Sequence, residues 1–213
     1  MIILFNGPPR SGKDAAADYF KEKGWKHLSF KYQLYKETAK YFGVDYEWFM
    51  NRYDDRSVKE VPHMDLGHMS CREAMIYVSE EIVKPKRGLD YFGNQVANEI
   101  DLNKNYAISD GGFVDELIPI INKIGDNNFV LVQLTRDGCD YSTDSRRYFD
   151  GDVQQEYINS HRTEINKKYV LPHKFNVKTY RVHNNSTIES FYSVLEQIHK
   201  KEFYGKGSQS RAA

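Results

Sequence analysis

Cysteine is scarce in this chain, because Cys71 and Cys139 are the only two among 213 residues. Two cysteines are too few for a disulfide framework, and they lack the spacing of metal ligands. A small scaffold stabilised by disulfides or zinc is therefore excluded. Scarce cysteine is also typical of proteins that work in a reducing cytoplasm, which is where we expect this one.

Long apolar runs are missing as well. No stretch reaches the roughly 18 residues that a membrane-spanning helix needs. Met1 leads straight into a strand-like run, without the basic start and cleavage site of a secretory signal. We therefore expect no membrane partner and no signal peptide.

A surplus of charge of either sign is absent too, because 30 Lys and Arg residues balance 30 Asp and Glu residues. Nothing global attracts the chain to a nucleic-acid backbone or to an anionic membrane, although a local basic cleft stays open. The sequence predicts no nucleic-acid partner, and it leaves a homodimer open.

The chain does have a clear alternation of strand-like and helix-like segments. Residues 1–6 are a short apolar run, typical of a buried parallel strand. Further strands are expected at 25–30, 106–109, 129–135 and 177–182, and helices after Asp14 and at 32–42, 46–53, 71–83, 91–100, 114–124 and 186–200. The pattern predicts an α/β fold with a parallel sheet of about five strands flanked by helices.

We expect one domain over residues 1–204 and a disordered tail over 205–213. Two polar inserts, 31–100 and 137–170, interrupt the alternation, and both are expected to be helical segments that cover substrates. In the first insert, Ser70 and Glu73 form a capping box that opens a helix. Pro85 is expected to end that helix.

A glycine-rich motif follows the first strand, where residues 7–14 (GPPRSGKD) match G-x-x-x-x-G-K. The glycines let the loop curl so that backbone N–H groups face a β-phosphate, and the next helix adds its positive end. Lys13 is expected to reach the β- and γ-phosphates. A strand before and a helix after are the context that this motif requires. We interpret it as an ATP-binding loop formed by Gly7, Arg10, Ser11, Gly12 and Lys13.

Asp14 stands where Ser or Thr usually offers a neutral oxygen to Mg²⁺. A carboxylate at this position could ligate the metal or hold a metal-bound water. It could instead cap the helix, because acidic side chains are favoured at helix N-termini. The sequence leaves these three roles open.

The segment Arg10–Asp14, followed by Ala17-Asp18-Tyr19-Phe20, resembles the P-loop of bacteriophage deoxynucleoside monophosphate kinases, in which Asp after the Lys is usual. Other pieces occur in the family's order over residues 3–199. These are Arg72-Glu73, Ser79-Glu80, Lys84-Pro85, residues 109–113 (SDGGF) with Glu116, Asp144-Ser145-Arg146 and Asn184-Asn185.

This resemblance implies an adenylate-kinase-like P-loop kinase that uses ATP and Mg²⁺ and takes small-molecule nucleotides as partners. It makes 31–100 the acceptor-binding insert and 137–170 the lid, and it implies the host cytoplasm if the source is a bacteriophage. One departure stands out. Many relatives carry Arg shortly after the Asp of the third strand, where this chain has Gly111-Gly112, so part of the acceptor site is expected to be built differently.

Three residues are candidates for binding the acceptor. Arg72 starts a helix, and its planar guanidinium could donate two parallel hydrogen bonds to a monophosphate, although a helical Arg is usually solvated. Lys84 belongs to a basic cluster around Pro85, which is either a phosphate patch or a solvated run of charge. Glu116, in the helix after the third strand, is either an acceptor contact or a structural residue.

Asp110 ends the third strand, at the edge where open α/β sheets bind their ligands. It could hold Mg²⁺ or orient the acceptor, and the alternative is a turn-capping Asp before Gly111. Arg136 and Arg146 are candidate lid arginines that meet the transferring phosphoryl group. The alternative for them is a salt-bridged surface with the acidic residues of the second insert.

Asn184 and Asn185 follow the last strand. They could read an adenine edge, as the resemblance implies, or make the turn into the final helix. The function predicted from all of this is ATP-dependent phosphorylation of a deoxynucleoside monophosphate. The alternatives are a P-loop kinase of another acceptor, such as dephospho-coenzyme A or a modified base in DNA, and a non-catalytic nucleotide-binding regulatory protein.

Overall fold

The computed structural model describes residues 1–55, 57–142, 146–149 and 176–204. The chain forms two compact units. The first comprises 1–27, 104–112 and 126–213, and the second comprises 28–103 and 113–125. The first unit contains the glycine-rich loop, and the second contains the whole of the first insert.

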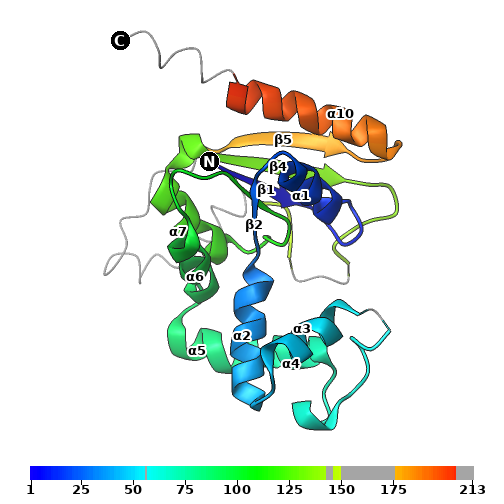
Figure 1. The fold of residues 1–213 in the computed structure, drawn as a ribbon, viewed down its shortest axis with the longest axis vertical. Coiled ribbons are helices and arrows are strands. Elements are labelled where there is room, and N and C mark those ends of the chain that lie inside the picture. Colours follow the sequence, from blue (N-terminus) through cyan, green and yellow to red (C-terminus); the bar gives the residue numbers. More distant parts are fainter. Residues whose placement is uncertain (56, 143–145, 150–175, 205–213) are drawn as a thin grey trace. The chain divides into compact units, whose positions relative to one another are not determined.

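A five-stranded sheet has the order β2-β3-β1-β4-β5 (Figure 1). Its strands are β1 (Ile2–Asn6), β2 (Lys26–Leu28), β3 (Tyr106–Ile108), β4 (Phe129–Thr135) and β5 (Lys178–His183). The central strand β1 pairs in parallel with β3 and β4, and β4 pairs in parallel with β5. The predicted α/β class, with a parallel sheet of about five strands flanked by helices, is confirmed.

One face of the sheet packs against α1 (Lys13–Glu22) and α10 (Ile188–His199). All five residues of β1 are buried, as expected for a central parallel strand with both faces covered. Phe20 of α1 and Phe191 and Leu195 of α10 meet Phe5 and Val132 of the sheet in one apolar cluster. This cluster holds the start of α1, and with it the end of the glycine-rich loop, against the central strand.

Glu196 ties α10 to α1 at the edge of that cluster. Its carboxylate accepts a hydrogen bond from Tyr19 Oη. It also forms ion pairs with Lys23 Nζ at 3.1 Å and with Lys200 Nζ at 3.5 Å. The hydrogen bond from Tyr19, followed by that from Lys23, lowers the pKa of Glu196 from 4.5 to about 2. The carboxylate therefore stays charged in the folded protein at pH values where it is protonated in the unfolded chain.

We expect the melting temperature to fall as the pH is lowered from 4.5 to 2, and Glu196→Gln to flatten that part of the curve. A carboxyl whose pKa is depressed by folding stabilises the fold above its unfolded pKa and loses this contribution as the pH falls through its folded pKa. Thermal unfolding of both proteins over this pH range is the measurement. The exposed Glu22 gives the control variant Glu22→Gln, and a Glu196→Gln curve parallel to the parent's would contradict the prediction.

The second unit is helical. It contains α2 (Phe30–Phe42), α3 (Tyr46–Asp54), a 3₁₀ turn η1 (Met64–Leu66), α4 (Cys71–Tyr77), a π-helical segment η2 (Val78–Val83), α5 (Lys84–Arg87), α6 (Tyr91–Glu99) and α7 (Val114–Ile124). Tyr35, Phe49 and Leu66 are fully buried in its core, together with Ala74 of α4. Gly93 lets α6 approach α7, because a Cβ there would lie 2.4 Å from the carbonyl oxygen of Glu116.

The capping box at the start of α4 is confirmed. The Ser70 side chain accepts from the Glu73 N–H, and the Glu73 carboxylate accepts from the Ser70 N–H at 2.8 Å. The expected end at Pro85 is wrong, because η2 continues α4 directly into α5 and Pro85 lies inside α5. Pro85 lies where the hydrogen-bond pattern changes, because the Lys84 N–H still donates to Ser79 in the π-helical pattern and the Gly88 N–H donates to Lys84 in the α-helical one. The helical stretch therefore ends only at Gly88.

The described parts of the second insert, residues 137–142 and 146–149, contain no helix. The rest of that insert and the tail at 205–213 lie outside the described residues. The first unit also contains a 3₁₀ turn, η3 (Asp126–Asn128), and a π-helical turn, η4 (Lys200–Tyr204). Among the described helices, none combines the length and the apolar character that crossing a membrane requires.

Candidate phosphate-binding site

The glycine-rich loop connects β1 to α1 and is closely packed. A Cβ on Gly7 would lie 2.6 Å from the Leu134 carbonyl oxygen and 2.6 Å from Ser11 Oγ. Gly12 has φ 103°, in the left-handed region that disfavours side chains. Arg10, with φ 65°, also adopts this region. Gly7 is thus required by its contacts with Leu134 and Ser11, and Gly12 by its own backbone conformation.

Lys13 is the first residue of α1, and its side chain folds back over the loop. Its Nζ donates to the carbonyl oxygens of Gly7 and Pro8, each at 2.7 Å. The ammonium group is therefore held against the loop by the loop's own backbone. That is the position from which a lysine can meet an anion that enters the loop.

Ser11 provides a test of whether the loop suits a phosphate. It is fully buried, and its Oγ finds no hydrogen-bond partner among the described residues. Buried hydroxyls in folded proteins are nearly always hydrogen-bonded, so one without a partner in a loop of this shape suits a polar ligand. The loop residues present therefore fit a nucleotide phosphate.

Asp14 lies exposed in the first turn of α1. Gly12 is the N-cap residue, and no side chain caps this helix by a hydrogen bond. Asp14 therefore adds a favourable charge near the helix N-terminus but does not cap it. Its carboxylate remains a candidate for the metal roles predicted from the sequence.

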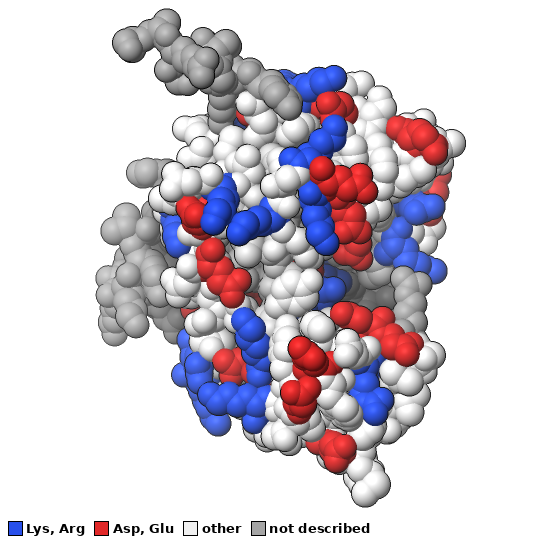
Figure 2. Space-filling view, in the orientation of Figure 1, with Lys and Arg blue, Asp and Glu red and all other residues white. Residues whose placement is uncertain are grey.

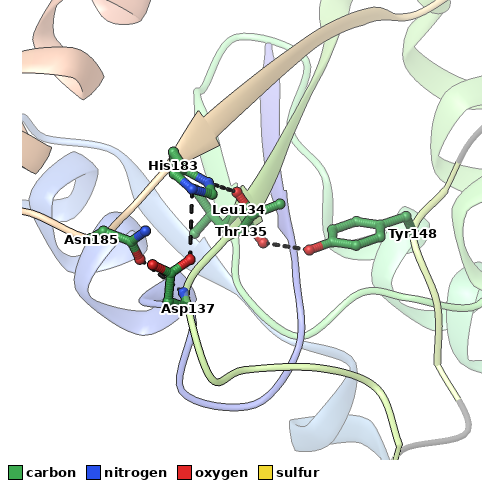
Figure 3. Close-up of polar contacts among 6 residues, drawn as sticks. All are labelled: Leu134, Thr135, Asp137, Tyr148, His183 and Asn185. Atoms are coloured by element: carbon green, nitrogen blue, oxygen red, sulfur yellow. Dashed lines mark hydrogen bonds and ion pairs between the residues drawn. The ribbon is translucent and has the colours of Figure 1, made fainter.

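The carboxyl ends of β4 and β5 approach the loop from its other side. Arg136, directly after β4, donates from Nη1 to the carbonyl oxygen of Arg10 at 3.4 Å. In the next loop, Asn185 Oδ1 accepts from the Asp137 N–H at 2.8 Å, and His183 contacts both Thr135 Oγ1 and Asp137 (Figure 3). The structure thus brings Arg136 to the loop and places Asn185 beside the start of the second insert.

Residues 146–149 of the second insert lie across the carboxyl edge of three neighbouring strands. Asn6 of β1 donates to the Arg147 carbonyl oxygen at 3.1 Å and accepts from the Phe149 N–H at 2.9 Å. On β4, Gln133 donates to the Phe149 carbonyl oxygen at 3.0 Å, and Tyr148 Oη donates to Leu134 (Figure 3). This short strap is anchored by the sheet edge.

Arg146 begins the strap at the end of β3. Its Nη1 donates to the Asp110 carbonyl oxygen at 3.4 Å. A Cβ on Gly112 would come within 2.8–2.9 Å of Cβ, Cγ and Cδ of Arg146, so the glycine makes room for the arginine stem. The two candidate residues Asp110 and Arg146 are therefore neighbours, and the Asp110 side chain is largely buried.

Lys84 and Glu116, two of the acceptor candidates, belong to the second unit. Lys84 Nζ pairs with Glu80 at 2.6 Å and lies over the Phe113 ring, 4.8 Å from its centroid. Glu116 is buried in α7, where it supports the contact with α6. Lys84 is therefore already neutralised within its own unit. The neighbouring Lys86 and Arg87 are exposed, and Figure 2 shows basic side chains where Figure 1 draws α5.

Arg72, the third acceptor candidate, lies in another cationic group. Its Nη1 is 3.8 Å from Glu60 Oε1, and Lys59 stacks over the Tyr53 ring at 4.0 Å. Burial, and next the positive charge of Arg72, lower the pKa of Lys59. Arg72 lies at the start of α4 and Lys84 at the start of α5, so that most of α4 and the whole of η2 separate them. Each pairs with a different glutamate, so they belong to separate cationic groups.

The sequence by itself indicates no role for Asn6 and leaves two roles open for Asn184. Asn6 is buried at the end of an apolar strand, which is itself a signal, because a buried amide there needs partners. Asn184 lies on the same side as Val182 by the two-residue alternation of a strand, and both are buried. The alternation therefore distinguishes Asn184 from the exposed Asn185.

No protein-family model matches the chain, and no curated protein does either. Among solved structures, it is similar to a shikimate kinase from Acinetobacter baumannii, at 13% identity and a TM-score of 0.40, over 96% of this chain and 94% of the other. A shikimate kinase from Bacteroides thetaiotaomicron shows 14% identity and a TM-score of 0.40, over 94% and 98%. A gluconokinase from Sinorhizobium meliloti shows 10% identity and a TM-score of 0.41, over 96% of each chain. Likeness this distant assigns neither substrate nor residue roles, and the bacteriophage family stays a prediction.

Proposed function

We propose that this protein is a P-loop kinase that transfers the γ-phosphoryl group of ATP to a deoxynucleoside monophosphate. The observation that carries the proposal is the loop between β1 and α1. This loop contains the buried Ser11 hydroxyl, which has no partner among the described residues, and the ammonium of Lys13, which is held against the loop backbone. It also contains Gly7 and Gly12, where a Cβ would collide with neighbouring atoms. These are the parts that a triphosphate-binding loop requires.

The chain's residues have distinct roles in this proposal. Backbone N–H groups of Gly7, Arg10, Gly12 and Lys13, together with the ammonium of Lys13, hold the phosphates and compensate their charge, since Pro8 and Pro9 have no N–H to donate. Arg136 and Arg146, at the ends of β4 and β3, add positive charge at the transferred group. Asp14 and Asp110 are the residues that would hold Mg²⁺, directly or through water. Bound Mg·ATP supplies the phosphoryl group, and the acceptor's phosphate is nucleophilic enough to need no strong base.

The acceptor is the less supported part of the proposal. The ordered resemblance over residues 3–199 favours a deoxynucleoside monophosphate. Arg72, with Lys59 near it, is the better candidate for the acceptor's phosphate, because its contact with Glu60 is longer, at 3.8 Å, than the 2.6 Å pair of Lys84 with Glu80. Two cations close together favour a doubly charged phosphate over a neutral hydroxyl acceptor.

A substrate screen tests the proposal. All common ribo- and deoxynucleoside monophosphates, with dephospho-coenzyme A added, are incubated with Mg·ATP and scored by ADP formation. We expect at least one deoxynucleoside monophosphate to raise ADP formation far above the acceptor-free rate, with Lys13→Ala as the background. If only another acceptor does so, the acceptor assignment is wrong. If none does, the transfer of phosphate to these acceptors is refuted.

The Mg²⁺ dependence tests Asp14. We expect Asp14→Asn to raise the Mg²⁺ concentration needed for half-maximal rate, because a neutral amide binds the hard cation more weakly. Asp14→Ser should retain part of the activity by offering a neutral oxygen. Asp18→Asn, on the same helix and equally exposed, is the matched control. An Asp14→Asn variant with unchanged Mg²⁺ dependence would exclude a metal role.

A further inference from the structure

Asn184 makes direct contact with the phosphate-binding loop. Its Nδ2 donates to the Ser11 carbonyl oxygen at 2.9 Å, across 173 positions of sequence. The residue is 9% exposed, so this hydrogen bond is shielded from water. A Cβ on Gly12 would lie 2.4 Å from the same nitrogen. The amide therefore fits closely against the peptide that joins Ser11 to Gly12.

Asn184 is itself held firmly. Its N–H donates to the Thr135 carbonyl oxygen at 2.8 Å, which extends the pairing of β5 with β4 by one residue. On either side, His183 contacts Thr135 Oγ1 and Asn185 accepts from the Asp137 N–H (Figure 3). The donor that meets the loop thus belongs to the edge of the sheet, which has little freedom to move.

Because the peptide bond is planar, the contact between Asn184 and the Ser11 carbonyl oxygen also sets the direction of the Gly12 N–H. In a trans peptide, the C=O and N–H groups point in opposite directions, and no cis peptide occurs among the described residues. Holding the Ser11 carbonyl against Asn184 therefore turns the Gly12 N–H away from Asn184. The backbone at Gly12 would otherwise be free to rotate, because a glycine at φ 103° has many alternative conformations.

We propose that Asn184 is a positioning residue that fixes the Ser11–Gly12 peptide so that the Gly12 N–H donates to a phosphate of the nucleotide. This inference rests on the proposed nucleotide binding by the loop, but not on the identity of the acceptor. It also assigns different roles to adjacent asparagines. Asn184 orients the loop, whereas the exposed Asn185 is the candidate for contact with the base.

The experiment compares Asn184→Ala and Asn184→Asp with the parent by titration calorimetry. The probes are Mg·ATP and Mg·tripolyphosphate, because the second has no base or sugar. We expect both variants to bind both probes about 10- to 100-fold more weakly, as for the loss of a buried hydrogen bond. Asn185→Asp is the matched control for added charge, and its affinity for tripolyphosphate should fall much less than that of Asn184→Asp.

A second measurement separates positioning from stability. Protein labelled with ¹⁵N-glycine gives few resonances, since the chain has 14 glycines. Saturating Mg·tripolyphosphate should change the chemical shift of the Gly12 amide resonance strongly in the parent and weakly in Asn184→Asp. The aspartate variant keeps the volume of the side chain, so it serves for this measurement if the alanine variant folds poorly. Variants with lower melting temperatures but parental affinities and an unchanged Gly12 shift would overturn the inference.

The outcomes for the two proposals are distinguishable. A parent that binds both probes but phosphorylates no acceptor would refute the transfer reaction and leave the role of Asn184 supported by the binding data. A parent that binds neither probe would refute both proposals.

Discussion

Lys13→Ala is expected to fold normally and to transfer phosphate about 10²–10³ times more slowly than the parent, the usual effect of removing one preorganised electrostatic donor. The ammonium of Lys13 is bound to the Gly7 and Pro8 carbonyl oxygens at 2.7 Å, so it is already present in the loop before a nucleotide arrives. Its loss removes positive charge where negative charge develops. Initial rates at saturating Mg·ATP and acceptor are the measurement.

Lys21→Ala is the matched control for this prediction, because Lys21 is an exposed lysine in the last turn of the same helix. Its rate should equal that of the parent. Melting temperatures of both variants establish that the fold is intact. A folded Lys13→Ala variant with a rate within a few-fold of the parent's would show that Lys13 is not the phosphate lysine.

Arg146→Ala is expected to lower kcat by roughly 10²-fold while leaving the KM for the acceptor nearly unchanged. Its guanidinium lies at the carboxyl end of β3 and donates to the Asp110 carbonyl oxygen, and the proposal places it at the transferred group. An interaction that strengthens mainly in the transition state appears in kcat. Arg72→Ala, by contrast, should mainly raise the KM for the acceptor.

Gly112→Ala tests the position of Arg146 without changing the arginine itself. Its new Cβ would lie within 2.9 Å of the Arg146 stem, so the arginine must move, and kcat should fall about 10-fold or more because small misplacements are costly in catalysis. Arg147→Ala is the comparison from the same strap, because it also removes an arginine side chain but keeps the Arg147 carbonyl oxygen that Asn6 holds. If Arg146→Ala changes only the acceptor KM, the strap faces the acceptor instead.

Local signals in the sequence predicted most of the elements within a few residues. The apolar run at 1–6, the capping box at Ser70 and the helix over 114–124 are each produced by neighbours in the chain, so short-range patterns suffice to find them. The loop from Gly7 to Lys13 is partly of the same kind, because Gly12 is required by its own backbone conformation, whereas Gly7 is also required by its contact with Leu134 of β4.

The helical stretch around Pro85 is where a local rule failed. Pro85 was expected to stop a helix, yet it lies at the change from the π-helical pattern of η2 to the α-helical pattern of α5, and the helical stretch continues through it. The same continuous helical stretch separates Arg72 from Lys84. Two residues that composition alone groups as phosphate-binding cations are thus kept apart by the rise of a helix.

The chain's sequence by itself determined that a glycine-rich loop lies between the first strand and the first helix, because the motif and its context are contiguous. Only the tertiary structure decided which distant residues support that loop. Asn184 and Asn185 are chemically identical neighbours, and only the pairing of β5 with β4 directs one to Ser11 and the other to Asp137. The approach of Arg146 to Gly112 likewise joins positions 34 residues apart in sequence. Such contacts depend on how strands are ordered in the sheet, which no short stretch of sequence encodes.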